Sequence, residues 1–129
     1  MTAEEIEAAI EAWLEGNVTE VGDVTMRVHP ELPTRYGSAT IDSLEELQDY
    51  LECSKPDDYV LNIPGVGVIE HVEQFGGEGL GDDAWYVWKI DGRFFKKQGW
   101  HQSNHGTEYD GDFFEVQAVP VLRTEWQSV

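Results

Sequence analysis

The sequence predicts an α+β fold in which one or two N-terminal helices pack on a mostly antiparallel sheet of four to six strands. Apolar residues recur at helical spacing in residues 1–58, whereas β-branched and aromatic residues dominate residues 59–129. A length of 129 residues is typical of one domain. We therefore expect a single domain, 1–129, with a helix-containing acidic part at 1–58 and a β-rich part at 59–129.

The first helix is expected at Ala3–Glu15. Thr2–Glu5 has the spacing of a capping box, and Gly16 is a typical residue just past a helix end. One apolar stripe at helical spacing consists of Ile6, Ala9, Ile10, Trp13 and Leu14. We expect Ile6, Ile10, Trp13 and Leu14 to be buried against the sheet.

The second helix is expected after Ser43–Glu46, which repeats the spacing of a capping box. Leu44, Leu47 and Leu51 follow at helical spacing, and Pro56 closes the segment. Between the two helices, Val24–Val28 alternates apolar and polar residues like a strand, and a short extended piece follows at Ser38–Ile41.

The β-rich part contains five segments of β-branched and aromatic residues. They are 59–63, 66–75, 84–90, 93–97 and 113–122. Asp91 and Gly92 predict a two-residue hairpin turn, because a type I′ turn needs positive φ at both central positions. Trp85 and Val87 alternate with Tyr86 and Trp88, so aromatic side chains are expected on both faces of that strand.

The net charge of −18 limits the classes of partner. Residues 1–58 hold fifteen acids and three bases, and residues 59–129 hold eleven acids and five bases, so the whole surface is acidic. Such a field repels nucleic acids, anionic membranes and phosphate-bearing substrates, and it favours basic partners. We expect a cytoplasmic protein for three reasons. Cys53 is the single cysteine, the first residues do not read as a signal peptide, and no apolar run approaches the roughly 18 residues of a membrane span.

The stretch GWHQSNHGTEYDGDFF at 99–114 concentrates side chains that bind metals or act in catalysis. His101 and His105 have metal-ligand spacing only on a helix, and the glycines around them favour a loop. Ser103 and Asp110 would complete a serine–histidine–aspartate set, but such sets are normally assembled from separate elements. We expect no metal, no cofactor and no catalytic activity.

The same region carries the pattern G-aromatic-x-x-S-x-x-G-T-E-aromatic-D-G, followed by E-V-x-x-V-P. The matching residues are Gly99, Ser103, Gly106, Thr107, Glu108, Asp110, Gly111 and Glu115. The last 55 or so residues thereby resemble a module of uncharacterised small phage and prophage proteins, with His101 and Asn104 departing from its pattern. The resemblance implies a phage setting and an all-β module, and it implies no activity. We expect 99–115 to be a long turn between two strands.

These observations favour an acidic interaction protein that binds the basic surface of a host protein, and we expect that host protein to bind nucleic acid. A globule of this length is about 36 Å wide, and duplex DNA of that length carries roughly 21 charges, which is comparable with −18. The expected role is inhibition of a defence nuclease, as in anti-restriction or anti-CRISPR proteins. Acids at spacings of three and four share the outer face of each helix. The expected contact residues are Glu4, Glu7, Glu11 and Glu15 on the outer face of the first helix and Glu45, Asp49 and Glu52 on that of the second, with Trp100, His101, Asn104 and His105.

Two alternatives remain open from the sequence. In the first, the acidity serves only solubility, as in proteins of a salt-rich cytoplasm. In the second, the chain binds a small ligand through the 99–115 loop. A nucleotide would then need a basic pocket, for which the candidates are Arg93, Lys96, Lys97 and Arg123.

Overall fold

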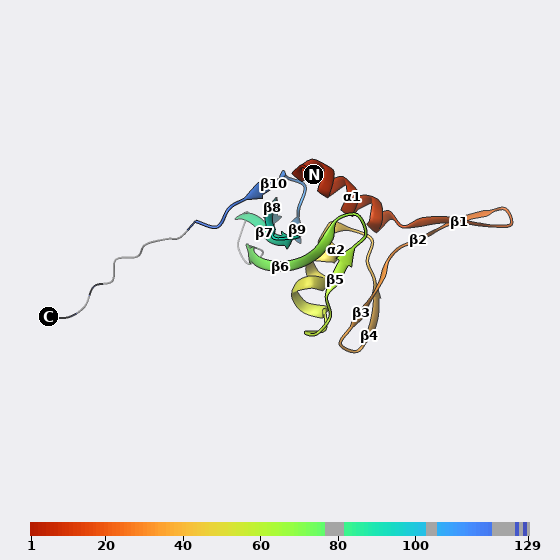
Figure 1. Ribbon diagram of the computed structural model, residues 1–129, viewed down its shortest axis with the longest axis horizontal. Coiled ribbons are helices and arrows are strands. Elements are labelled where there is room, and N and C mark those ends of the chain that lie inside the picture. Colours follow the sequence, from red (N-terminus) through yellow and green to blue (C-terminus); the bar gives the residue numbers. More distant parts are fainter. Residues whose placement is uncertain (77–81, 103–105, 120–125, 127, 129) are drawn as a thin grey trace.

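The computed structural model describes residues 1–76, 82–102, 106–119, 126 and 128, and it has the predicted α+β fold (Figure 1). Its centre is an antiparallel sheet of six strands, in the order β10-β8-β7-β6-β5, with β9 also paired to β8. The strands are β5 (Leu61–Ile63), β6 (Gly67–Phe75), β7 (Asp82–Ile90), β8 (Arg93–Gln102), β9 (Gly106–Glu108) and β10 (Phe113–Val116). The prediction of the fold class is confirmed.

The first helix, α1 (Ala3–Glu15), begins and ends where the sequence predicts. The backbone N–H of Glu5 donates to Oγ1 of Thr2 at 3.2 Å, and the Glu5 carboxylate accepts from the Thr2 N–H at 3.3 Å. Gly16 ends the helix with φ of 78°. Ile6, Ile10 and Leu14 are buried, whereas Trp13 is only partly buried.

The second helix, α2 (Leu44–Asp49), continues into a π-helical turn, η1 (Tyr50–Ser54). The Ser43 hydroxyl accepts from the N–H of Glu46 at 3.2 Å, as expected for an N-cap. The Glu46 carboxylate accepts from the N–H of Asp42 at 3.2 Å. In a capping box this carboxylate would accept from the N–H of Ser43. Here it accepts from the residue before, so only the hydrogen bond to the Ser43 hydroxyl follows the predicted pattern. No helix in the described part of the chain is long and apolar enough to cross a membrane.

Two separate hairpins lie between the helices. They are β1 (Asn17–Val21) with β2 (Val24–Val28), and β3 (Glu31–Thr34) with β4 (Gly37–Thr40). The β1–β2 hairpin projects from the body (Figure 1). The alternating pattern correctly predicts β2, but Val24, Met26 and Val28 are all more than half exposed.

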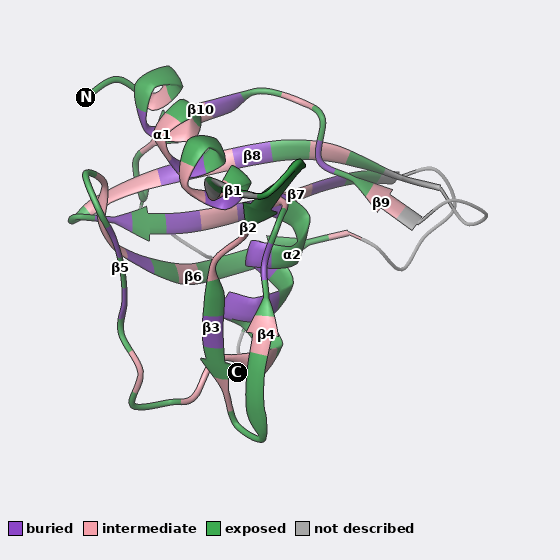
Figure 2. Ribbon diagram, turned by 90° about the vertical axis from the view of Figure 1, so that its right-hand side faces the viewer, coloured by how far each residue is buried: buried purple, intermediate pink, exposed green. Residues whose placement is uncertain are grey.

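The core lies between the helices and one face of the sheet (Figure 2). On β7, Tyr86, Trp88 and Ile90 point into this core and are almost completely buried. Trp85 and Val87 point to the opposite face and are partly exposed. Aromatic side chains therefore lie on both faces of the strand, as predicted. The helices cover only one of these faces.

The turn between β7 and β8 fixes the register of the two central strands. Asp91 and Gly92 have φ of 50° and 81°, as the predicted type I′ turn requires. The register places Trp88 opposite Phe95 and Tyr86 opposite Lys97. Lys97 therefore points into the same side of the sheet as the core aromatics.

The expectation of a long turn at 99–115 is wrong for most of that stretch. β8 extends to Gln102, and β9 pairs with it, so that Trp100 lies opposite Glu108. Gly99 is inside β8, where a Cβ atom would overlap the carbonyl oxygen of Glu108 and the ring of Tyr109. Its role is to allow this close approach rather than to form a turn.

Candidate functional site: an acidic hollow between the helices

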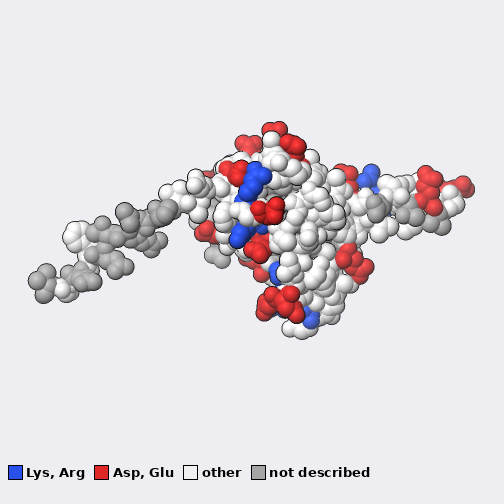
Figure 3. Space-filling model, in the orientation of Figure 1, with Lys and Arg blue, Asp and Glu red and all other residues white. Residues whose placement is uncertain are grey.

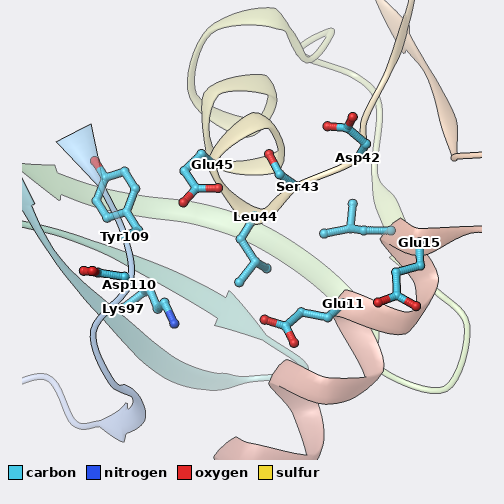
Figure 4. A pocket seen from close by; sticks show the side chains of 10 residues that line it. Glu11, Glu15, Asp42, Ser43, Leu44, Glu45, Lys97, Tyr109 and Asp110 are labelled. Atoms are coloured by element: carbon cyan, nitrogen blue, oxygen red, sulfur yellow. The ribbon is translucent and has the colours of Figure 1, made fainter. Parts of the chain in front are cut away.

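A hollow of about 450 Å³ opens between α1, the start of α2 and the segment that follows β9 (Figure 4). Five carboxylates line it, namely Glu11, Glu15, Asp42, Glu45 and Asp110. The remaining lining comes from Leu14, Ser43, Leu44, Lys97 and Tyr109. We call this feature the acidic hollow. Residues from four separate parts of the sequence converge there.

Helix periodicity explains the contribution of α1. Leu14 is buried on the core side, while Glu11 and Glu15 lie one turn apart on the flank that faces α2. Glu15 also lies 3.6 Å from Arg27 at the base of the hairpin. Both glutamates are exposed, so the rim of the hollow on this side is charged and open to solvent.

The N-cap of α2 positions the opposite rim. Because Ser43 and Glu46 hold the backbone at the helix start, Asp42 and Glu45 are placed on either side of the cap. The buried side chain of Leu44 anchors this turn in the core. In Figure 4 the carboxylates of Glu45 and Glu11 point toward the space between the two helices.

Glu7 has a different role from the one expected on an outer helix face. Its Oε2 atom accepts a hydrogen bond from Nζ of Lys97 at 2.8 Å. The side chain of Glu7 is 23 % exposed and that of Lys97 is 8 % exposed. The prediction of one exposed face formed by Glu4, Glu7, Glu11 and Glu15 is therefore corrected for Glu7, which forms a partly buried ion pair.

Lys97 contributes the single positive charge of the lining. Its charge is compensated by Glu7, and Glu15 is paired with Arg27, so Glu11, Asp42, Glu45 and Asp110 give the hollow its excess negative charge. Concave sites focus the field of such charges, so the hollow attracts cations and repels phosphates.

Tyr86 adjoins two residues that line the acidic hollow, Lys97 and Tyr109. It projects from β7 on the same side as its register partner Lys97, and its ring meets that of Tyr109 edge-on at 4.8 Å. Burial raises the pKa of its hydroxyl, and the carboxylates of Glu45 and Glu7 raise that pKa further. The side chain is 0 % exposed, and among the described residues its hydroxyl has no hydrogen-bond partner.

The predicted acids of the second helix are not all in one place. Glu45 lines the hollow, whereas Asp49 and Glu52 are exposed farther along α2 and η1 and are absent from its lining. Glu52 instead accepts from Nε2 of the buried Gln48 at 3.4 Å. Of the three acids predicted as contacts on the second helix, only Glu45 thus belongs to the hollow.

Of the predicted aromatic and histidine contacts, only the side chain of Trp100 is described, and it does not line the acidic hollow. Trp100 is 45 % exposed, and it alternates along β8 with Lys97 and Gly99, so it points to the opposite face of the sheet. Only the backbone of His101 is described, and Asn104 and His105 lie outside the described residues.

The bases considered for a nucleotide pocket are dispersed. Arg93 forms a two-pronged pair with Glu115, at 2.9 and 2.8 Å. Lys96 lies over the ring of Trp85 on the sheet face that the helices do not cover. Lys97 projects from the opposite face, toward α1. Arg123 lies outside the described residues. These three described bases therefore form no common basic pocket.

Acidic side chains also occur away from the hollow. Figure 3 shows them over several separate parts of the visible face, including the projecting hairpin. They do not form one continuous row there. Among the residues that the structure describes, no three His, Cys, Asp or Glu side chains are placed to hold a metal ion.

Sequence reasoning missed Lys97, Asp42, Asp110, Tyr86 and Tyr109 as members or neighbours of the site. A signal for Lys97 existed, because the Asp91–Gly92 turn places it opposite Tyr86 on the buried face. Comparisons with protein-family models, curated proteins and solved structures give no match for this chain.

Proposed function

We propose that this chain is a non-catalytic interaction protein that binds a basic surface of another macromolecule through the acidic hollow. The observation that carries the proposal is the convergence of five carboxylates around one concave site. A net charge of −18 adds a long-range field of the same sign. Together they favour encounter with cationic side chains and disfavour anionic ligands.

The finer part of the proposal is that the partner is a nucleic-acid-binding protein. Such proteins carry clustered lysine and arginine side chains, which match an acidic concave surface. The resemblance of the last 55 or so residues to a phage module implies a phage setting, and inhibition of a host defence nuclease is the role that we propose within it. A binding event of this kind would block the nucleic-acid site of the partner without any chemical step.

The competing explanation is that the acidity serves solubility. Acids on many elements fit that explanation, because a dispersed negative surface keeps a protein soluble without any particular site. The two explanations differ in one respect. If the hollow is a binding site, removing a charge there should weaken binding more than removing a charge elsewhere. If the acidity serves solubility, only the net charge should matter.

The experiment compares two variants with the same net charge. In Glu11→Gln/Glu45→Gln both changes lie in the acidic hollow, and in the control Glu20→Gln/Glu73→Gln both lie at exposed positions elsewhere. Isothermal titration calorimetry with a lysine–glycine repeat peptide measures the affinity. We expect about a tenfold loss for the first variant and less than about threefold for the control, because each removed contact contributes roughly 0.7 kcal/mol.

Salt and DNA displacement complete the test. Affinity of the wild-type protein should fall as salt rises, since the contacts are exposed and screened. The protein should also displace duplex DNA from the same peptide in a gel-shift experiment. Equal losses for the two variants would show that bulk charge alone is responsible, and the proposal would then be abandoned in favour of solubility.

A further inference from the structure

The buried hydroxyl of Tyr86 is a second feature, besides the carboxylates, that bears on what the acidic hollow binds. A buried hydroxyl without a partner is unfavourable by about 1–3 kcal/mol, and native proteins seldom leave one unpaired. Tyr86 is fully buried, and its hydroxyl has no partner among the described residues.

Tyr86 belongs to the core, and it adjoins the hollow through Lys97 and Tyr109, both of which line it. Tyr86 lies opposite Lys97 in the β7–β8 register, and Lys97 lines the hollow. Two of the carboxylates that act electrostatically on Tyr86, Glu45 and Glu11, also line it. Both are exposed side chains, which change rotamer on the nanosecond timescale. Because Tyr86 itself is fully buried, a bound group reaches its hydroxyl only if the neighbouring side chains move.

The arrangement of acceptors suits a wide, planar cation. The lining carboxylates come from three separate places, namely α1, the start of α2 and Asp110. In the part of the chain that the structure describes, no three of them are close enough to share a metal ion. A guanidinium presents five N–H donors in one plane and is weakly hydrated, so it can bond several separated acceptors at once.

The apolar part of the lining suits an arginine stem. Leu14 and Leu44 contribute to the lining between the two charged rims. Methylene groups of a long cationic side chain commonly pack on such residues while the charged head meets the carboxylates. A hollow of about 450 Å³ has room for one such side chain with its hydration water.

We propose that the acidic hollow receives one arginine side chain of a protein partner, with Glu11, Glu45 and Asp110 around the guanidinium and the Tyr86 hydroxyl as an additional acceptor. This inference rests on the proposed function and goes beyond it, since it names the anchoring group. Arginine is preferred to lysine because an ammonium has only three donors around one nitrogen.

The test uses two amidated repeat peptides, arginine–glycine and lysine–glycine, and the variant Tyr86→Phe. Calorimetry should show that the wild-type protein binds the arginine peptide about tenfold more tightly than the lysine peptide, because one further charge-assisted hydrogen bond is formed. Tyr86→Phe should remove most of that preference. Its unfolding midpoint should stay equal to or above that of the wild type, because the change deletes an unpaired buried group.

The outcomes separate this inference from the proposed function. If neither peptide binds at low salt, both proposals fail. If the hollow variant loses affinity but the protein shows no preference for arginine, or Tyr86→Phe retains the full preference, only the arginine anchor is overturned. Free arginine amide binding as tightly as the peptide would identify a small guanidino ligand instead of a partner's side chain, and would also overturn it.

Discussion

The Nζ atom of Lys97 lies 2.8 Å from Oε2 of Glu7, and this ion pair joins the centre of the sheet to α1. The ammonium is nearly buried, so it needs an acceptor to offset the loss of hydration. Glu7 supplies that acceptor one turn before Glu11, which lines the acidic hollow. The pair therefore fixes the helix flank from which the candidate site is built.

Breaking this pair should destabilise the fold. Glu7→Gln should lower the free energy of unfolding by about 2–3 kcal/mol, because it leaves the Lys97 charge buried without its counter-charge. Chemical denaturation measures the change. The control Glu11→Gln removes the same charge one turn later at an exposed position and should change stability by less than about 0.5 kcal/mol. Identical midpoints for the two variants would contradict a structural role for the pair.

Truncation of α1 side chains should follow their burial. Ile10 is completely buried, and Ile10→Ala should cost about 2–5 kcal/mol. Trp13 is only partly buried, so Trp13→Ala should cost less than the 3–5 kcal/mol typical of a core tryptophan, about 1–3 kcal/mol. Urea denaturation of both variants tests this order. A larger loss for Trp13→Ala would mean that its ring contributes more to the core than its exposure indicates.

The close approach at Gly99 should not tolerate a side chain. Gly99→Ala places a methyl group against the Glu108 carbonyl oxygen and the Tyr109 ring, so β8 and the following segment must move apart. We expect a loss of about 2 kcal/mol in the free energy of unfolding. Gln98→Ala, at the exposed neighbouring position, is the control. A neutral Gly99→Ala would show that Tyr109 is not held against the strand.

The stability of the protein should depend on the protonation of His71. Burial lowers the pKa of His71 below its ordinary value of 6.5, and nearby Glu52 raises it in partial compensation. The unfolded chain therefore binds this proton more readily than the folded protein. The neutral form of His71 therefore contributes stability that is complete above about pH 6.5. That contribution is lost as the pH falls toward and through the lower pKa of the folded state.

The measurement for His71 is an NMR titration of its ring protons, with His71→Gln as the control for the pH dependence of unfolding. The neutral ring lies 3.1 Å from Nε2 of Gln48, whose Oε1 accepts from the Trp88 indole at 2.6 Å. The wild-type protein should lose more stability than the variant between pH 7 and about 5.5. A folded pKa at or above 6.5 would contradict the account.

Much of the fold could be predicted because it is specified locally. The capping residues Thr2 and Ser43 and the Asp91–Gly92 turn act within a few residues of their own positions. Periodicity also gave the buried stripe of α1, apart from the partial exposure of Trp13. These signals do not depend on how distant segments meet.

The acidic hollow could not be predicted in the same way, because it depends on tertiary packing. Helical spacing placed Glu11 beside Glu15, but nothing in the sequence showed that Asp42 and Asp110 would approach them. The strand β9 was missed because glycines and polar residues suggested a turn. Trp100 was expected at the contact surface because its stretch was expected to form a turn. It lies in β8 instead, and strand alternation directs its side chain to the other face of the sheet.

The most direct test of the binding site is an NMR titration of the ¹⁵N-labelled protein with the lysine–glycine repeat peptide. We expect the largest backbone shift changes around Glu11, Glu45 and Asp110, and small changes at Glu20 on the projecting hairpin and at Trp100 on the sheet face that the helices do not cover. Shift changes spread evenly over the acidic residues of the chain, or concentrated around Trp100, would contradict this expectation.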